Sequence, residues 1–168
     1  MIMAPFASVI LALVTAERLA ELWLARRNTA RLLARGAVEH APGHYPLIVG
    51  LHALWLAGLW MLAWDAPVNL GWLALFGALQ VLRVWVLATL GARWTTRIIV
   101  LPSVPLVASG PYRFLSHPNY VVVVGELLVL PLVFGLTLFA LTFTVLNATV
   151  LFIRIRAEND ALVVHGKG

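Results

Sequence analysis

The chain has 168 residues, of which 62% are hydrophobic and only 11% are charged. A soluble domain of this size needs far more charge to cover its surface, so the composition favours a protein that lies in a bilayer. The net charge is +5, but the basic residues are scattered singly, which argues against nucleic acid as a partner. There is no cysteine, which excludes disulfides, thiolate catalysis and zinc bound by cysteine.

Five apolar runs are long enough to cross most or all of a hydrocarbon core of about 30 Å as helices. They predict an all-α, polytopic membrane helix bundle in which the whole chain, 1–168, forms one membrane domain. The chain has no GxGxxG fingerprint, which argues against a Rossmann domain. The fourth and fifth runs are joined by little more than Phe134-Gly135, so a tight helical hairpin is expected there. The predicted spans cover residues 3–25, 46–64, 70–91, 119–134 and 136–156.

The distribution of charge predicts the orientation of this bundle. Basic residues gather after the first span, between the third and fourth, and at the end of the fifth, whereas the other two connections hold only Asp65. Five spans place all three basic segments on one side, which the positive-inside rule assigns to the cytoplasm, and they leave the N-terminus outside. A four-span chain places one basic segment on the wrong side. Tryptophans are expected to form an outer belt (Trp60, Trp64 and Trp72) and an inner one (Trp23 and Trp94).

Polar side chains within the spans form a second pattern. At a rise of 1.5 Å per residue, they fall in one layer in the cytoplasmic half of the bundle. Ionisable groups inside a membrane usually pair, and they face the bundle interior or a watery cavity, so Glu126 is predicted to pair with Arg83. The layer has a structural interpretation, as polar contacts that hold the helices together, and a functional one. Its predicted members are Glu17, Arg18, Glu21, His52, Gln80, Arg83, Glu126 and Asn147.

Two cytoplasmic segments complete the pattern. Residues 92–118 contain four prolines and many apolar residues, so this connection is expected to lie at the interface or to fold back over the bundle as a lid or a wall of the substrate entrance. At the end of the fifth span, Asn147, Arg154 and Glu158 fall on one helical face. His40 and His44 are separated by Pro42 and Gly43, which break a helix, so no metal site is predicted there.

The second half of the chain resembles the isoprenylcysteine carboxyl methyltransferase (ICMT) family of integral-membrane methyltransferases. The resemblance covers roughly residues 90–168, and its motifs follow in order. They are Leu90-Gly91 with Trp94, Gly110-Pro111-Tyr112-Arg113, His117-Pro118-Asn119-Tyr120, Gly125-Glu126, and Arg154 followed by Glu158 and Leu162. The family usually has two acidic residues in succession near the end, whereas this chain has Glu158-Asn159 with Asp160 following; Glu158 is the carboxylate assigned here to the cofactor.

The resemblance implies a helical membrane enzyme that uses S-adenosylmethionine, converts it to S-adenosylhomocysteine, and binds it from the cytosol. When the roles of the family's motif residues are transferred to the matching positions of this chain, the cofactor-binding residues are Tyr112, His117, Pro118, Tyr120, Arg154 and Glu158. The short chain looks more like a bacterial branch, some of whose members accompany type III polyketide synthases and O-methylate alkylpyrones. This implies the bacterial inner membrane as the location, a possible link to such a synthase, and a lipophilic acceptor that enters from the bilayer lipids.

The implied reaction is attack by an acceptor oxygen on a sulfonium methyl, in a site where orientation and exclusion of water supply much of the catalysis. A carboxylate acceptor, as in isoprenylcysteine, needs no base. An enol or phenol hydroxyl needs one, and His117 is the first candidate and Glu126, paired with Arg83, the second. The alternatives are a phospholipid-type N-methyltransferase, a membrane sterol reductase, a non-enzymatic scaffold or lipid-binding protein, and a small transporter.

Overall fold

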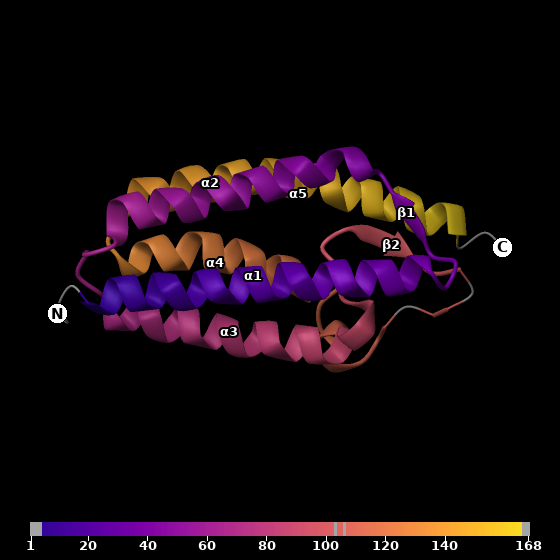
Figure 1. Ribbon diagram of the computed structural model, residues 1–168, viewed down its shortest axis with the longest axis horizontal. Helices are drawn as coiled ribbons and strands as arrows, with labels where there is room; N and C mark the ends of the chain where they lie inside the picture. Colours follow the sequence, from indigo (N-terminus) through magenta and orange to yellow (C-terminus); the bar gives the residue numbers. More distant parts are fainter. Residues whose placement is uncertain (1–4, 103, 106, 166–168) are drawn as a thin grey trace.

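Five long helices account for most of the molecule in a computed structural model that describes residues 5–102, 104–105 and 107–165. They lie side by side along the long axis of the molecule, and the first helix begins at the opposite end from that at which the last helix ends (Figure 1). Their bounds are Pro5–Leu33 (α1), Tyr45–Ala63 (α2), Leu70–Leu90 (α3), Pro118–Val133 (α4) and Thr137–His165 (α5).

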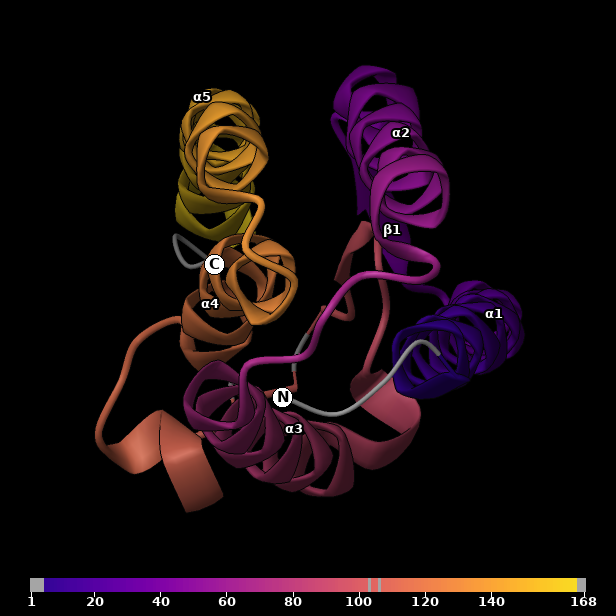
Figure 2. The same ribbon diagram turned by 90° about the vertical axis from the view of Figure 1, so that its left-hand side faces the viewer.

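Successive helices run in opposite directions, so the connections alternate between the two ends of the bundle (Figure 1). Seen from one end, α4 lies between α3 and α5, while α1 and α2 lie on the other side (Figure 2). Gly125 allows α4 to approach α3 closely, because a Cβ at this position would come within 2.9 Å of Leu79. Small residues at such crossings let the helix backbones come together, as is common in membrane bundles.

The connections at one end carry the remaining ordered elements, and we call this end of the bundle the motif end. A short antiparallel ladder joins β1 (Val38–His40), after α1, to β2 (Ile98–Val100), after α3. Short 3-10 helices cover Pro42–His44 (η1), Gly91–Arg93 (η2) and Gly110–Arg113 (η3). The connection after α3 therefore folds back against the chain between α1 and α2, as expected for residues 92–118; the small sheet was not predicted.

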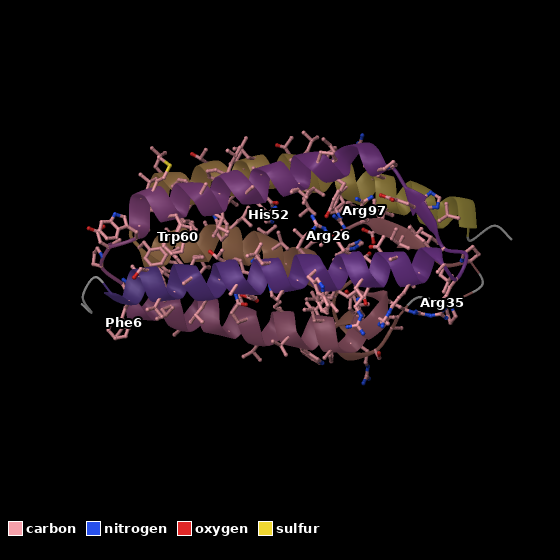
Figure 3. The ribbon with its side chains drawn as sticks, in the orientation of Figure 1. Phe6, Arg26, Arg35, His52, Trp60 and Arg97 are labelled. Carbon is pink, nitrogen blue, oxygen red and sulfur yellow. The ribbon has the colours of Figure 1, made fainter. Side chains whose placement is uncertain are left out.

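The hydrophobic core occupies the opposite end of the bundle. Its buried members come from α1, α2, α3 and α4 and from the turns next to them, and they include Leu11, Trp55, Leu59, Phe76 and Leu130. Figure 3 shows Phe6 and Trp60 towards this end and Arg35 at the motif end. Apolar packing thus closes one end of the bundle, whereas polar groups concentrate in the other half.

The structure confirms the predicted all-α membrane helix bundle and moves several boundaries. Three helices, α2, α3 and α5, are long and apolar enough to cross a membrane. α1 runs on to Leu33 and carries Glu17, Arg18 and Glu21 within its length, and α4 has only 16 residues. Five passes, and the orientation of the two ends, stay predictions.

Candidate active site

A buried ion cluster joins α1, α3 and α4 near the middle of these helices. Arg83 of α3 donates from Nε to Glu126 Oε1 at 2.7 Å and from Nη2 to Glu126 Oε2, and its Nη1 lies 2.8 Å from Glu21 Oε1. Gln80 donates to Glu126 Oε1 at 2.7 Å, and Arg18 Nη2 lies 3.0 Å from the same oxygen. The predicted pair of Glu126 and Arg83 is confirmed. The second partner, Glu21, was not predicted.

Glu126 is enclosed by this cluster and is only 1% exposed. Its two carboxylate oxygens are occupied by Arg83, Arg18 and Gln80. Removing one member of such a buried pair leaves an uncompensated charge, which is strongly destabilising. The arrangement therefore fixes α1, α3 and α4 relative to one another, and it favours a positioning role for Glu126; a role as general base stays a prediction.

The Gly-Pro-Tyr motif folds as η3 against the end of α3. Gly110 has a φ of 57°, and a Cβ there would lie 2.4 Å from Thr89 Oγ1 of α3, so only glycine fits this close approach. Pro111 is fully buried. Tyr112 is thereby held at the motif end, where burial, and next the charge of Glu158, raise the pKa of its hydroxyl to about 12.

The His-Pro-x-Tyr motif begins α4. His117 is the N-cap residue and Pro118 takes the first helical position, where its missing N–H costs nothing. The rings of His117 and Tyr120 stack with centroids 5.0 Å apart. Pro118 is fully buried, so its contribution to a binding site is to set the start of α4 and thereby the positions of these two rings.

Tyr120 connects the motif to the last helix. Its hydroxyl donates to Glu158 Oε2 and accepts a hydrogen bond of 3.0 Å from Arg154 Nε. Arg154 also donates from Nη1 to the backbone carbonyl of Thr96 at 2.7 Å. Arg154 and Glu158, which were predicted to share a helix face, thus meet at one hydroxyl, and their network reaches the connection after α3.

Two cavities open around this network. The first, which we call the polar cavity, has a volume of about 300 Å³ and is lined by Tyr112, His117, Tyr120, Arg154 and Glu158 together with residues of the connection 93–107. Of the six residues predicted to bind the cofactor, these five line it and Pro118 does not.

The second cavity, the apolar cavity, has a volume of about 290 Å³ and lies between the helices. Leucine, isoleucine and valine side chains supply much of its wall, and Arg83, His52 and Asn147 of the predicted polar layer also line it. His52 projects from α2 into the bundle (Figure 3), and its Nδ1 lies 2.8 Å from the carbonyl oxygen of Ile48. Because a carbonyl oxygen only accepts, Nδ1 carries the proton and Nε2 of the neutral ring is the acceptor.

The polar and apolar cavities share part of their lining. The shared residues are Trp94, Thr95, Asn119, Tyr120 and Arg154. We call them the shared wall. Glu126 lines neither of the two cavities, whereas its partner Arg83 lines the apolar one.

Long-range contacts hold the connection that carries Trp94. Asn28 of α1 donates from Nδ2 to the carbonyl oxygens of Gly91 and Trp94, at 3.2 and 2.9 Å. Arg97 lies 2.9 Å from Glu39 across the small sheet. Trp94 is 3% exposed, so its assignment to an inner aromatic belt was wrong: this ring is part of the shared wall and not of the bilayer-facing surface.

The sequence analysis missed Asn28 as an anchor and Trp94 and Asn119 as cavity residues. Asn28 gave no local signal, because its partners lie more than 60 positions away. Asn119 stands inside the His-Pro-Asn-Tyr motif, and its position there was the signal that could have identified it.

Comparison with known proteins gives the site its context. The model of the isoprenylcysteine carboxyl methyltransferase (ICMT) family matches residues 72–164, which is more than half of the chain. This chain belongs to the ICMT family. It is therefore a membrane methyltransferase, and S-adenosylmethionine is the methyl donor that enzymes of this family use.

Two relatives align over nearly the whole chain. The YpbQ protein of Bacillus subtilis, described as uncharacterized, is 38% identical over 91% of this chain and 94% of its own length. An uncharacterized protein of Haemophilus influenzae is 26% identical over 94% of this chain and 95% of its own. No solved structure matches this ICMT-family chain. Both relatives are bacterial proteins of similar length, and their names do not specify an acceptor.

Proposed function

We propose that this ICMT-family protein transfers a methyl group from S-adenosylmethionine, bound in the polar cavity, to an oxygen of a lipophilic acceptor bound in the apolar cavity. The single observation that carries the proposal is the shared wall, at which the two cavities meet. Methyl transfer requires the two reactants to come within about 3–3.5 Å, and adjoining cavities for a charged and an apolar reactant provide that arrangement.

The residues of the polar cavity fit the charges of this cofactor. S-Adenosylmethionine carries two cationic groups, a carboxylate and an aromatic base. Glu158 supplies a carboxylate for a cationic group, Arg93 and Arg97 supply guanidinium groups for the cofactor's carboxylate, and the rings of His117 and Tyr120 supply an aromatic surface. When bound, the cofactor supplies an electrophilic methyl group on a positively charged sulfur.

The chain's own residues prepare the transfer. Tyr120 and Arg154 belong to both cavities and are fixed by hydrogen bonds to Glu158 and Thr96, so the meeting point is rigid. The acceptor oxygen forms the new carbon–oxygen bond as the carbon–sulfur bond breaks, and the electron pair of that bond stays on sulfur. If the acceptor is a hydroxyl, its proton passes to a base, and His117, which lines the polar cavity and stacks on Tyr120, is the proposed base.

The apolar cavity supports a lipid acceptor that enters from the bilayer, such as an alkylpyrone made by a type III polyketide synthase or an isoprenylcysteine-type carboxylate. The cavity lies among helices that are themselves long and apolar enough to span a membrane. In this proposal the motif end faces the cytoplasm, from which the cofactor enters. A scaffold without enzymatic activity accounts for the ion cluster but leaves the two adjoining cavities without a purpose.

Isothermal titration of the detergent-purified protein with S-adenosylmethionine and S-adenosylhomocysteine tests the cofactor site. We expect Glu158→Gln to weaken binding of S-adenosylmethionine about 10- to 150-fold, the value of a hydrogen bond to a charged group. His117→Ala should weaken binding of both ligands. Asp65→Asn, which removes a carboxylate from the exposed connection at the other end, is the matched control and should bind as the wild type does. A folded wild-type protein that binds neither ligand would overturn the proposal.

A further inference from the structure

Three residues that line the apolar cavity each carry a buried N–H donor without a partner. They are Trp55 Nε1, Trp94 Nε1 and Asn147 Nδ2, and among the described residues none of these atoms has a hydrogen-bond acceptor. The three residues are 2%, 3% and 4% exposed, and all three line the cavity. Buried polar groups in folded proteins are almost always hydrogen-bonded, so three unpartnered donors around one cavity call for an explanation.

The donors come from separate parts of the fold. Trp55 belongs to α2, Trp94 to the connection after η2, and Asn147 to α5. The rest of the wall mixes aliphatic side chains with polar ones, and none of the polar groups bonds these three N–H donors. Trp94 also lines the polar cavity, so one donor stands where the proposed transfer occurs, and the other two stand on the helices that enclose the acceptor.

Arginine side chains on the same wall are further N–H donors. Arg18, Arg83 and Arg154 line the cavity against one carboxylate, that of Glu21. Glu21 is already engaged, because it lies 2.8 Å from both Arg18 and Arg83. Arg18 and Arg83 are also paired with Glu126, so their charge is balanced, and what the cavity presents is a surplus of N–H donors. The cavity suits carbonyl or anionic oxygens and disfavours an ammonium group, which can only donate.

We propose that Trp55, Trp94 and Asn147 form a donor subsite that holds the head group of the methyl acceptor, and that this head group presents carbonyl or anionic oxygens and not an amine. The inference rests on the proposed function, whose acceptor class it narrows. His52 Nε2, an acceptor on the same wall, suits a hydroxyl proton of such a head group. N-Methylation of an aminolipid, the alternative open from the sequence, is disfavoured by this subsite.

The test uses the full-length protein in detergent, saturated with S-adenosylhomocysteine, and three amphiphiles with the same undecyl chain at equal mole fraction in the micelle. Their heads are a 4-hydroxy-2-pyrone, a carboxylate and an ammonium group. We expect the pyrone and the carboxylate to raise the midpoint of thermal unfolding and the amine to leave it unchanged. An equal or larger rise with the amine, or no rise with either oxygen head, would overturn the proposal on the wild-type protein alone.

Two variants locate the effect. Asn147→Leu and Trp55→Phe remove a donor each while keeping most of the volume, and each should weaken binding of the oxygen heads about 10-fold, with a smaller thermal rise to match. Trp64→Phe, at an exposed tryptophan after α2, is the control and should keep the full rise. Unchanged rises in both variants would refute the subsite. Titration of each variant with S-adenosylhomocysteine shows whether it is folded, and it separates failure of this inference from failure of the proposed cofactor site.

Discussion

The polar cavity and the apolar cavity share one wall but differ in the parts of the chain that form the rest of their lining. Apart from Leu32, every residue that lines the polar cavity comes from Leu90 onwards, within the region that the ICMT family model matches. The apolar cavity takes a large part of its wall from α1 and α2, which precede that region. Family membership therefore informs mainly on the cofactor, whereas the identity of the acceptor depends also on the two N-terminal helices of this chain.

Arg83 connects the two regions, and its removal is expected to have the largest effect. It belongs to α3 and binds Glu21 of α1 and Glu126 of α4. Arg83→Leu leaves both carboxylates without this partner in a buried position, which should lower the free energy of unfolding by about 3–5 kcal/mol. Thermal unfolding in detergent measures the loss.

Two further variants calibrate the Arg83 result. Arg83→Lys keeps the charge but cannot donate to two oxygens of Glu126 at once, so its loss should be intermediate. Arg27→Leu, at an exposed position of α1, should stay within about 0.5 kcal/mol of the wild type. If Arg83→Leu unfolded at the wild-type temperature, the ion cluster would not be what joins α1 to α3 and α4.

Tyr120 tests the shared wall and should give the second largest effect. Tyr120→Phe keeps the stacking on His117 but removes the hydroxyl that bonds Glu158 and Arg154. Two charge-assisted hydrogen bonds are lost, so affinity for S-adenosylmethionine should fall about 10-fold or more by isothermal titration. Tyr45→Phe removes a hydroxyl from the apolar cavity instead and should leave that affinity unchanged. Equal effects of the two variants would argue against separate cofactor and acceptor cavities.

Sequence reasoning reached the helices and the pairing of charges because both depend on local or simple rules. The apolar runs predicted the bounds of the helices to within a few residues, except where α1 and α5 continue as polar helix beyond their apolar stretches. Opposite charges at equal depth gave the pair of Arg83 and Glu126. The resemblance to the ICMT family, not a physical rule, pointed to Tyr112, His117, Tyr120, Arg154 and Glu158 as one set, and these five line one cavity.

The remaining features depend on contacts that sequence spacing does not encode. Two three-residue strands, β1 and β2, pair across about 60 positions, and each is too short for a strand pattern to be recognised in the sequence. Trp94 follows the third predicted span, so the sequence suggested an interfacial tryptophan. Its burial in the shared wall depends on how the connection after α3 folds back, which the sequence does not show. The three unpartnered donors became visible only when α2, α5 and this connection were placed together.

Tyr112 offers the finest test, because it lines the polar cavity alone. Burial, and after it the charge of Glu158, raise the pKa of Tyr112 to about 12, whereas a tyrosine in the unfolded chain ionises near pH 10. The stability that Tyr112 contributes as a neutral phenol is therefore fully present below about pH 10 and is lost as the pH rises through about 12.

Tyrosinate absorbance, taken as the difference between the wild type and Tyr112→Phe, follows this one group through its titration. Glu158→Gln removes the negative charge that opposes ionisation, so it should lower the pKa of Tyr112 towards the value set by burial alone. Asp65→Asn, far from the cavity, should leave the titration where it is. If Tyr112 titrated at the same pH with and without the Glu158 charge, the carboxylate would not face Tyr112 across the polar cavity. The assignment of Glu158 as the group that binds a cationic part of the cofactor there would then be wrong.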